Sequence, residues 1–340
     1  MKRILIAAAA IALAPLAAHA EGKLNIFNWG EYTNPELLKR FSETYDVEVA
    51  IDTYDSNETM LAKVQAGASG YDIVVPSDYM VAIMIEEGLL AQVEPNTMEN
   101  FKNVKEGLVD LYFDPGRHYT VPWQVGNTGF AVNSKAYDGN INTWSILFDT
   151  PEALKGRINV LDDMTAVINA AARYLNIPRC TSDREQLRQI SDLLVAAKPN
   201  WRSFSYDGLT LLSTGSVDVS MLWNGATYKA RTEDVDSLVY AYPAEGLEGF
   251  VDNVAILKDA QNVDNAKLFM NFIMAPENAA LISEFAKYES GIKGVDAYLP
   301  ADFAAAPELN TPAGVTPEFV PPCSQEVTAM YNKIWTNLRR

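Results

Sequence analysis

The first hundred residues after an N-terminal apolar run alternate between strand-like and helical spacing of hydrophobic positions. Apolar residues recur at helical spacing through residues 35–45, directly after Asn34-Pro35, a pair typical of a helix N-terminus. We expect strands at 23–28, 47–54 and 71–77, and helices at 35–45, 58–66 and 81–87. The Ile-Val-Val centre of the third strand is typical of a sheet covered on both faces. The pattern predicts a parallel α/β unit, which binds ligands at the carboxyl ends of its strands.

Two long extended segments interrupt this alternation, at residues 119–133 and 249–257. Neither has helical periodicity, and the first carries Gly126 and Gly129 in its middle. Between them the alternation resumes, with strands expected at 157–163 and 217–223 and helices at 165–175 and 183–198. We therefore expect an α/β fold of two lobes that form a clamshell, joined by extended crossovers. The cleft between the lobes is the expected binding site.

These patterns predict a chain that is divided between more than one hydrophobic core. We expect the first part of lobe 1 at 21–128, the first part of lobe 2 at 129–249, and the return crossover with the completion of lobe 1 at 250–298. The remaining segment, 299–340, begins rich in Pro and Ala and ends in an expected helix. We expect this segment to pack on lobe 2.

Residues 1–20 have the pattern of a secretory leader. A basic start is followed by an apolar run that Pro15 interrupts, and Ala18-His19-Ala20 is a small-x-small cleavage site. The run is too short for a membrane-spanning helix. We therefore expect export to the periplasm, cleavage after Ala20, and no membrane-spanning part.

Charge and cysteine content narrow the range of partners. The chain has 27 Lys and Arg against 44 Asp and Glu, a net charge of −17, which argues against nucleic acid and anionic membranes as partners. The acidity is compatible with a cationic ligand. Cys180 and Cys323 are an even pair in an exported chain, so we expect a disulfide, with two buried thiols as the alternative.

The catalytic residues needed by several enzyme classes are missing. His118 is the only histidine after the leader, and no nucleophile motif surrounds it, which disfavours Ser-His and Cys-His sites and any two-histidine zinc site. No Walker loop or Gly-x-Gly-x-x-Gly motif is present. We expect no enzyme, no metal and no cofactor. A secreted hydrolase that uses paired carboxylates remains a distant alternative.

Aromatic and carboxylate residues gather at the expected strand ends and on the return crossover. They are Trp29, Glu31, Tyr32, Ser77, Tyr79, Asp163, Trp223, Phe250, Asp252 and Tyr288. Taken singly they have structural explanations: Trp29 would lie under the sheet edge, Asp163 would cap a helix, and Trp223 would be a core residue. Aromatic faces attract an ammonium group, and a desolvated ammonium needs carboxylate partners. Together these residues indicate a receptor for an elongated organic cation.

Several long stretches resemble the periplasmic spermidine/putrescine-binding proteins of bacterial ABC importers. They are "FNWGEYTNPELLKRF", "TYDSNETMLAKV", "YDIVVPSDY", "PAEGLEGFVDNVAIL" and "AKLFMNFIMAPENAA". The resemblance implies a type 2 periplasmic-binding-protein fold, a monomer, a polyamine held between the lobes and an inner-membrane permease as partner. By position it assigns ligand contacts to Trp29, Gly30, Glu31, Tyr32, Ser77, Tyr79, Asp163, Trp223, Phe250, Asp252 and Tyr288. It implies that Trp29 and Tyr32 wall the pocket and that Glu31 receives one end of the cation.

The sequence departs from this family at particular positions. "DDMTA" places Ala166 where the family usually has an acidic residue, Gly30 replaces a hydroxyl side chain, and Phe250 replaces a larger Trp. A shorter diamine held between Glu31 and Asp252 therefore stays open beside spermidine. A receptor for 4-aminobutyrate is the alternative, with Arg202 as the candidate carboxylate reader; a surface or interlobe salt bridge is the other explanation of Arg202.

Overall fold

The structure, a computed structural model, describes residues 22–67 and 70–340. The expected leader and its cleavage after Ala20 lie outside the described residues. The strands are β1 (Gly22–Trp29), β2 (Val47–Tyr54), β3 (Ile73–Val74), β4 (Thr120–Asn133), β5 (Ile158–Val160), β6 (Trp201–Phe204), β7 (Val219–Trp223), β8 (Leu238–Ala241) and β9 (Glu248–Ile256).

The helices connect these strands and cover the sheet. The α-helices are α1 (Pro35–Tyr45), α2 (Asn57–Gln65), α3 (Asp78–Glu86), α4 (Ser145–Phe148), α5 (Met164–Tyr174), α6 (Arg184–Ala197), α7 (Gly208–Ser213), α8 (Asn224–Glu233), α9 (Val263–Ile273), α10 (Pro276–Ala286), α11 (Ala301–Ala304) and α12 (Gln325–Arg339). The 3-10 helices are η1 (Pro95–Thr97), η2 (Glu99–Asn103), η3 (Glu106–Leu108), η4 (Glu152–Leu154), η5 (Lys198–Asn200) and η6 (Val295–Ala297). None of the helices in the two described ranges is long and apolar enough to cross a membrane.

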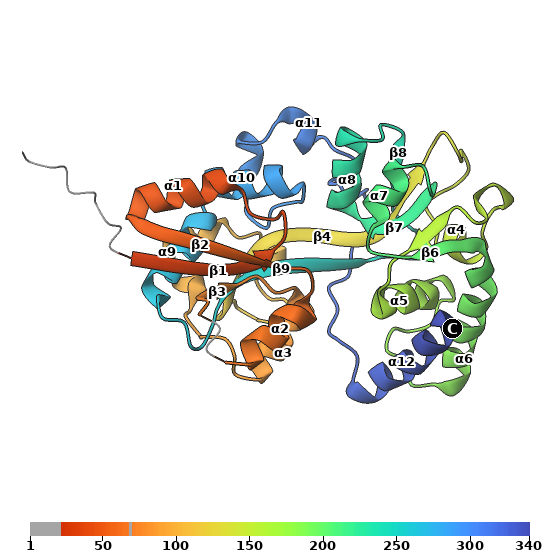
Figure 1. Cartoon of the computed structure of the whole chain (residues 1–340), viewed down its shortest axis with the longest axis horizontal. Helices are drawn as coiled ribbons and strands as arrows, with labels where there is room; N and C mark the ends of the chain where they lie inside the picture. The colour runs from red at the N-terminus through yellow and green to blue at the C-terminus, as the bar shows by residue number, and fades with distance from the viewer. Residues whose placement is uncertain (1–21, 68–69) are drawn as a thin grey trace, which may run out of the picture.

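Within the described residues the nine strands form one sheet that runs through both halves of the molecule. Its order is β2-β1-β3-β9-β4-β7-β5-β6, and β8 pairs with β4. The two long strands β4 and β9 are antiparallel and lie side by side along the middle of the molecule (Figure 1). Their pairing passes from lobe to lobe, with Thr120 opposite Ala255 at one end and Thr128 opposite Glu248 at the other. The two segments that the sequence predicts as crossovers are thus the centre of the sheet.

Two large hydrophobic cores lie on either side of this centre. One contains Phe41 of α1 and Phe269 of α9, and the other contains Trp144, Ile168 of α5 and Ile190 of α6. We call lobe 1 the half built on β1–β3 with α1–α3, α9 and α10, and lobe 2 the half built on β5–β8 with α4–α8 and α12. Figure 1 shows the two lobes at opposite ends of β4 and β9.

The first βα turn forms where the sequence predicts it. The Asn34 side chain accepts a hydrogen bond from the Glu36 N–H, and Pro35 occupies the first helical turn of α1. The expected third strand is shorter than predicted, because its ladder covers only Ile73–Val74 before Pro76, which has no N–H to donate. The following helix α3 begins at Asp78, three residues earlier than expected.

Apart from 3-10 helices, five elements of lobe 2 were not predicted: β6, β8, α4, α7 and α8. Helix α8 shows why. Its buried residues are Asn224, Gly225, Thr227, Tyr228 and Ala230, which are mostly small or polar. A helix that packs closely through small residues has no large apolar stripe, so hydrophobic periodicity does not detect it.

The C-terminal segment crosses the surface of lobe 2 before its final helix. Phe303 and Leu309 pack with Tyr228 of α8, and the buried carboxylate of Glu308 pairs with Arg231 of the same helix. Helix α12 packs on α5 and α6. A disulfide joins Cys180 and Cys323, with their Cα atoms 5.3 Å apart, and so ties the start of this helix to the loop between α5 and α6. A closed loop of this length stabilises by a few kcal/mol in the chain-entropy model.

Candidate functional site

Asp252 lies in the middle of β9, between the two lobes, and is only 6% exposed. The Tyr32 hydroxyl donates to its Oδ2 at 2.7 Å, and the Ser77 hydroxyl donates to its Oδ1 at 2.7 Å. Tyr32 follows the end of β1, and Ser77 follows the end of β3. The carboxyl ends of two parallel strands therefore meet the crossover at this carboxylate, as expected for a ligand site in an open α/β sheet.

The electrostatics of Asp252 favour a cation from outside the protein. Burial raises the pKa of Asp252 to about 6, and the hydrogen bonds from Ser77 and Tyr32 oppose part of that rise. Burial and the nearby charge of Asp252 raise the pKa of Tyr32, so its hydroxyl remains a hydrogen-bond donor. In the part of the chain that the structure describes, no lysine or arginine pairs with Asp252. A carboxylate has about four acceptor positions, and a desolvated one is stabilised by a charged donor.

Aromatic rings enclose the space next to Asp252. The Tyr288 ring lies edge-on to Tyr32, with centroids 5.9 Å apart, and 6.0 Å from the ring of Phe250. Phe250 lies flat against β4 because its strand neighbour is Gly126; a Cβ on that glycine would come within 2.3 Å of the ring. Burial raises the pKa of Tyr288, and the charge of Asp252 adds to the rise. These rings suit an ammonium group and its methylene chain.

Trp29 is fixed at the carboxyl edge of the sheet. Its indole N–H donates to the Val75 carbonyl at 2.9 Å, and its ring lies 4.7 Å from that of Tyr54. The Tyr54 hydroxyl donates to the same carbonyl at 2.6 Å. Trp29 remains half-buried, so a part of the indole is available at the end of β1.

A chain of hydrogen bonds extends from Asp252 to a second acidic side chain. The buried amide of Asn57 donates both to the Ser77 hydroxyl and to the Tyr79 hydroxyl, at 3.1 Å each. The Tyr79 hydroxyl donates in turn to Glu58 at 3.1 Å. The start of α2 therefore connects the Asp252 end of the site to a second anionic group.

Asp163 of lobe 2 lies near this second group. Its carboxylate accepts from the Ala166 N–H at 2.9 Å and so caps α5, which confirms the helix-cap explanation. Burial raises the pKa of Asp163, and the charge of Glu58 adds to the rise. Burial also raises the pKa of Tyr79, and the charges of Glu58 and, to a smaller extent, Asp163 add to the rise. Asp163 in lobe 2 and Glu58 and Tyr79 in lobe 1 therefore lie within electrostatic range of one another.

An aromatic pair borders the second acidic group. The ring of Trp223, at the end of β7, stacks on that of Tyr206, with centroids 6.2 Å apart and 13° between the planes. Tyr206 is 55% exposed; partial burial raises the pKa of its hydroxyl, and the charges of Asp163 and Glu58 add to the rise. Trp223 is half-buried rather than a closed core residue.

Ala166 lies beside an acidic residue that the sequence analysis did not single out. A cavity of about 10 Å³ is lined by Ala166, Asn169, Thr128 and Glu248, among others. The Glu248 carboxylate accepts from Asn169 at 2.7 Å and from Arg179 at 3.1 Å. Burial raises the pKa of Glu248, while the charge of Arg179 opposes the rise. An acidic side chain at position 166 would therefore lie near Glu248, whose carboxylate already has Arg179 as a basic partner.

Glu31 is placed differently from the expectation that it receives one end of a buried cation. Its side chain is 83% exposed, and its Oε2 is 3.0 Å from the Nζ of Lys229 on α8. An exposed carboxylate that is paired with a lysine does not provide a desolvated site for an ammonium. Glu31 instead joins the turn after β1 in lobe 1 to a helix of lobe 2. Gly30 before it is exposed, with open space around its Cα.

Arg202 does not approach Asp252 in the sheet. It lies on β6, the edge strand at the opposite end of the sheet from lobe 1, and its side chain is exposed. The neighbouring Trp201 is buried, as the alternation of a strand requires. Arg202 is thus a surface residue in this structure, and its role as a reader of a ligand carboxylate stays a prediction.

Sequence reasoning missed several residues around the candidate site: Asn57, Glu58, Tyr206 and Lys229. Asn57 and Glu58 directly follow the end of a strand in "YDSNET", which is the same signal that selected the other residues. Tyr206 follows β6, whose short length hid its carboxyl end. Lys229 lies on α8, which hydrophobic periodicity did not detect.

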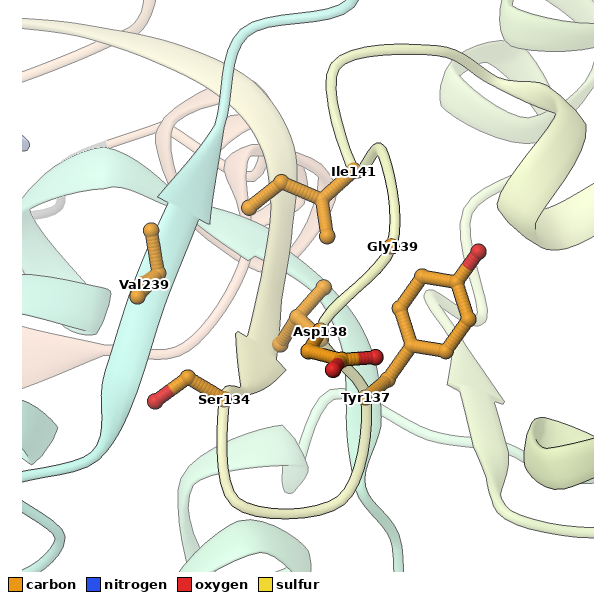
Figure 2. Close-up of a pocket in the computed structure, with 7 residues that line it drawn as sticks. Ser134, Tyr137, Asp138, Gly139, Ile141 and Val239 are labelled. Atoms are coloured by element: carbon orange, nitrogen blue, oxygen red, sulfur yellow. The ribbon is translucent and has the colours of Figure 1, made fainter.

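A separate surface pocket of about 170 Å³ lies at the far end of β4 in lobe 2. Figure 2 shows Val239 on one side of it and Tyr137 and Asp138 on the other. None of the residues around Asp252 or Asp163 lines this pocket. No group of three metal-ligating side chains occurs in the residues that the structure covers.

Known proteins resemble this chain over most of its length. It is 34% identical over 291 residues to the spermidine/putrescine-binding periplasmic protein of Escherichia coli, an alignment that covers 84% of this chain and 83% of the relative. It is 30% identical to the putrescine/cadaverine-binding protein of Pseudomonas aeruginosa, over 100% and 99% of the two chains.

The fold is likewise shared with solved structures. The spermidine/putrescine ABC transporter substrate-binding protein of Streptococcus pneumoniae superposes with a TM-score of 0.85 at 27% identity, covering 94% of this chain and 98% of that one. The expected two-lobe α/β fold of periplasmic binding proteins is confirmed by this likeness. The model of the bacterial extracellular solute-binding proteins matches residues 36–311. The chain belongs to the family of bacterial extracellular solute-binding proteins.

Proposed function

We propose that this protein captures a polyamine, putrescine or spermidine, between its lobes and delivers it to an ABC importer. The observation that carries the proposal is the buried carboxylate of Asp252, which has two hydroxyl donors and is enclosed by aromatic rings. A ligand ammonium supplies the counter-charge that the described side chains do not. Each aromatic face contributes roughly 0.5–2 kcal/mol to holding a cation. The names of the relatives, which include putrescine, support the same class of ligand.

The two acidic groups suit a ligand with a positive charge at each end. One ammonium binds at Asp252, and the second lies toward Asp163 and Glu58. The rings of Trp29, Tyr32 and Trp223 line the methylene chain between them. This arrangement recognises an elongated cation rather than a compact one, because a single ammonium satisfies only one of the two acidic groups.

Capture occurs by closure of the lobes, and no chemical reaction takes place. Helix α8 of lobe 2 contacts lobe 1 through the Glu31–Lys229 ion pair and through Gly225, which lies against Tyr288. Binding a ligand between the lobes favours this closed arrangement over an open one. The proposed partner is an inner-membrane permease that receives the ligand from a monomeric, periplasmic protein whose leader is removed after Ala20.

Calorimetry of ligand-stripped protein tests the proposal. We expect heat of binding with putrescine or spermidine, and none with 4-aminobutyrate or with maltose. Tighter binding of 4-aminobutyrate than of either amine would instead indicate an amino-acid receptor. Sugar binding or saccharide hydrolysis without amine binding would overturn the proposal in favour of a sugar receptor or a hydrolase.

A further inference from the structure

A buried carboxamide next to Asp252 has no hydrogen-bond partner. Gln124 lies on β4 and is 0% exposed, and among the described residues neither its Oε1 nor its Nε2 has a partner. Buried polar groups are nearly always paired, and leaving one unpaired costs roughly 1–3 kcal/mol. The Gln124 carboxamide can therefore be satisfied only by a group that is not among the described residues, such as a ligand or a bound water.

Gln124 lies on the same face of the sheet as the proposed ammonium site. It is directly opposite Asp252 in the antiparallel pairing of β4 and β9, and opposed residues project from the same face. Two residues along, Gly126 is opposite Phe250, and the Phe250 ring covers that glycine on this face. Asp252, Phe250 and Gln124 are thus neighbours on one surface.

The adjacent residue, Trp123, lies at an irregularity of the β4–β9 pairing between Pro122 and Gln124. The ring of Trp123 stacks near Phe269 of α9, with centroids 6.4 Å apart, inside the core of lobe 1. Its indole N–H is also buried and unpaired. Trp123 therefore offers a matched control: an unpaired buried donor on the same strand whose ring packs in the hydrophobic core of lobe 1.

We infer that Gln124 is a ligand-contacting residue that selects a primary ammonium at the Asp252 site; the inference rests on the proposed function. A primary ammonium has three N–H donors, whereas a secondary one has two. Asp252 accepts one of these bonds, the Gln124 carbonyl oxygen accepts a second, and the Tyr32 hydroxyl oxygen accepts the third, so the carbon that replaces one N–H in a secondary ammonium leaves one of these acceptors without a donor. The carboxamide N–H then points to an unused acceptor position of the Asp252 carboxylate, which receives only two hydroxyl donors in this structure.

The test compares Gln124→Leu with Trp123→Phe in ligand-stripped protein. The leucine variant should bind putrescine about ten-fold more weakly, because a hydrogen bond from a charged donor is lost. Its ligand-free melting temperature should not fall, since removing two unpaired buried polar atoms costs no native hydrogen bond. A residue with a purely structural role would instead lower the melting temperature. Trp123→Phe should leave putrescine affinity unchanged.

A second ligand isolates the selection of primary amines. N,N′-dimethylputrescine carries a secondary ammonium at both ends. The parent protein should bind putrescine more tightly than N,N′-dimethylputrescine. Gln124→Leu should reduce this preference by about the same ten-fold, because the N-methyl group of the ligand and the substitution remove the same hydrogen bond, the one to the Gln124 carbonyl oxygen. An unchanged preference, or unchanged putrescine affinity in Gln124→Leu, would overturn the role of Gln124 alone. If the parent protein bound no amine, the proposed function would fall and the inference with it.

Discussion

The two acidic ends of the site differ in what holds them in place. Asp252 is almost fully buried on a crossover strand, and its carboxylate is positioned by hydroxyl groups from lobe 1. Asp163 is half-buried in lobe 2, where its carboxylate already caps a helix. Its acidic neighbour Glu58 belongs to lobe 1. The first end is therefore assembled within one lobe and its crossover, whereas the second requires both lobes to be together.

This difference suggests separate tasks for the two ends. The Asp252 end presents a preformed, desolvated carboxylate, so it should hold one ammonium of any amine ligand. At the Asp163 end, the negative charges of Asp163 and Glu58 come together only when the lobes close. Binding at this end should therefore depend on the length of the ligand. A buried charge without its partner is also far more costly than an exposed one. The predictions below test this division, from the largest expected effect to the smallest.

Replacing Asp252 by Asn should nearly abolish binding of every amine. The loss should be about 2–5 kcal/mol, because an ammonium desolvated in the site would have no charged partner. Asp163→Asn should cost less, about 1 kcal/mol, because Asn also caps helices and Glu58 still supplies negative charge. Calorimetry of both variants with putrescine and spermidine measures the difference. Equal losses at the two positions would refute the proposed division.

Acidification should weaken amine binding while it stabilises the ligand-free protein. The pKa of Asp252 is about 6 in the fold and about 3.9 when unfolded, so between these values the folded state binds more protons. The free energy of unfolding of the ligand-free protein should therefore fall as pH rises through this window. Amine affinity should change in the opposite sense, roughly five-fold lower at pH 5 than at pH 6, since the cation needs the ionised form.

Melting curves at several pH values measure the stability of the ligand-free protein, and calorimetry at the same pH values measures the amine affinity. Asp78, with a pKa raised to about 7 by burial, adds to the stability trend in the same direction. In the variant Asp252→Asn, the free energy of unfolding should still depend on pH through Asp78 but no longer through Asp252. An amine affinity that does not change between pH 7 and 5 would place the cation away from Asp252.

The substitution Ala166→Glu should increase the discrimination between spermidine and putrescine at the Asp163 end of the site. Ala166→Glu adds a carboxylate in the first turn of α5, near Asp163, and should strengthen spermidine binding more than putrescine binding. The gain should be about 1 kcal/mol, at the low end for a charged hydrogen bond, because the nearby charge of Glu248 opposes the new one. Ala166→Gln is the uncharged control. Equal gains for both amines would show that this helix start does not sense ligand length.

Breaking the Glu31–Lys229 ion pair should have the smallest effect. Both side chains are partly exposed, and such pairs contribute less than about 1 kcal/mol. Glu31→Gln and Lys229→Gln should each weaken putrescine and spermidine alike, by at most a few-fold, because the pair stabilises the closed arrangement rather than one ligand.

The double variant Glu31→Lys/Lys229→Glu provides the control for this pair. It should recover most of the affinity, since the reversed charges pair again across the lobes. If Glu31→Gln instead weakened only the longer amine and Lys229→Gln had no effect, Glu31 would contact the ligand as the family resemblance implies.

Much of this protein follows from local sequence patterns. The cap at Asn34-Pro35 and the periodic positions of α1 place the first βα turn. The extended segments around Gly126 and Asp252 lack any helical period, and the structure shows them as the long strands β4 and β9. Such features depend on interactions between near neighbours in the chain, which a single sequence displays directly.

The chemistry of particular side chains depended on the tertiary structure. The sequence places both Glu31 and Asp252 in one cleft, yet only the packing of α8 gives Glu31 a lysine partner and leaves Asp252 buried without one. Gln124 has no distinguishing signal in its own segment, and it gains a role only because β9 pairs with β4 in the register that sets it opposite Asp252. Burial, charge and hydrogen bonding are properties of neighbours far apart in the chain, so the sequence determined which residues reach the site, and the fold decided which of them are available to a ligand.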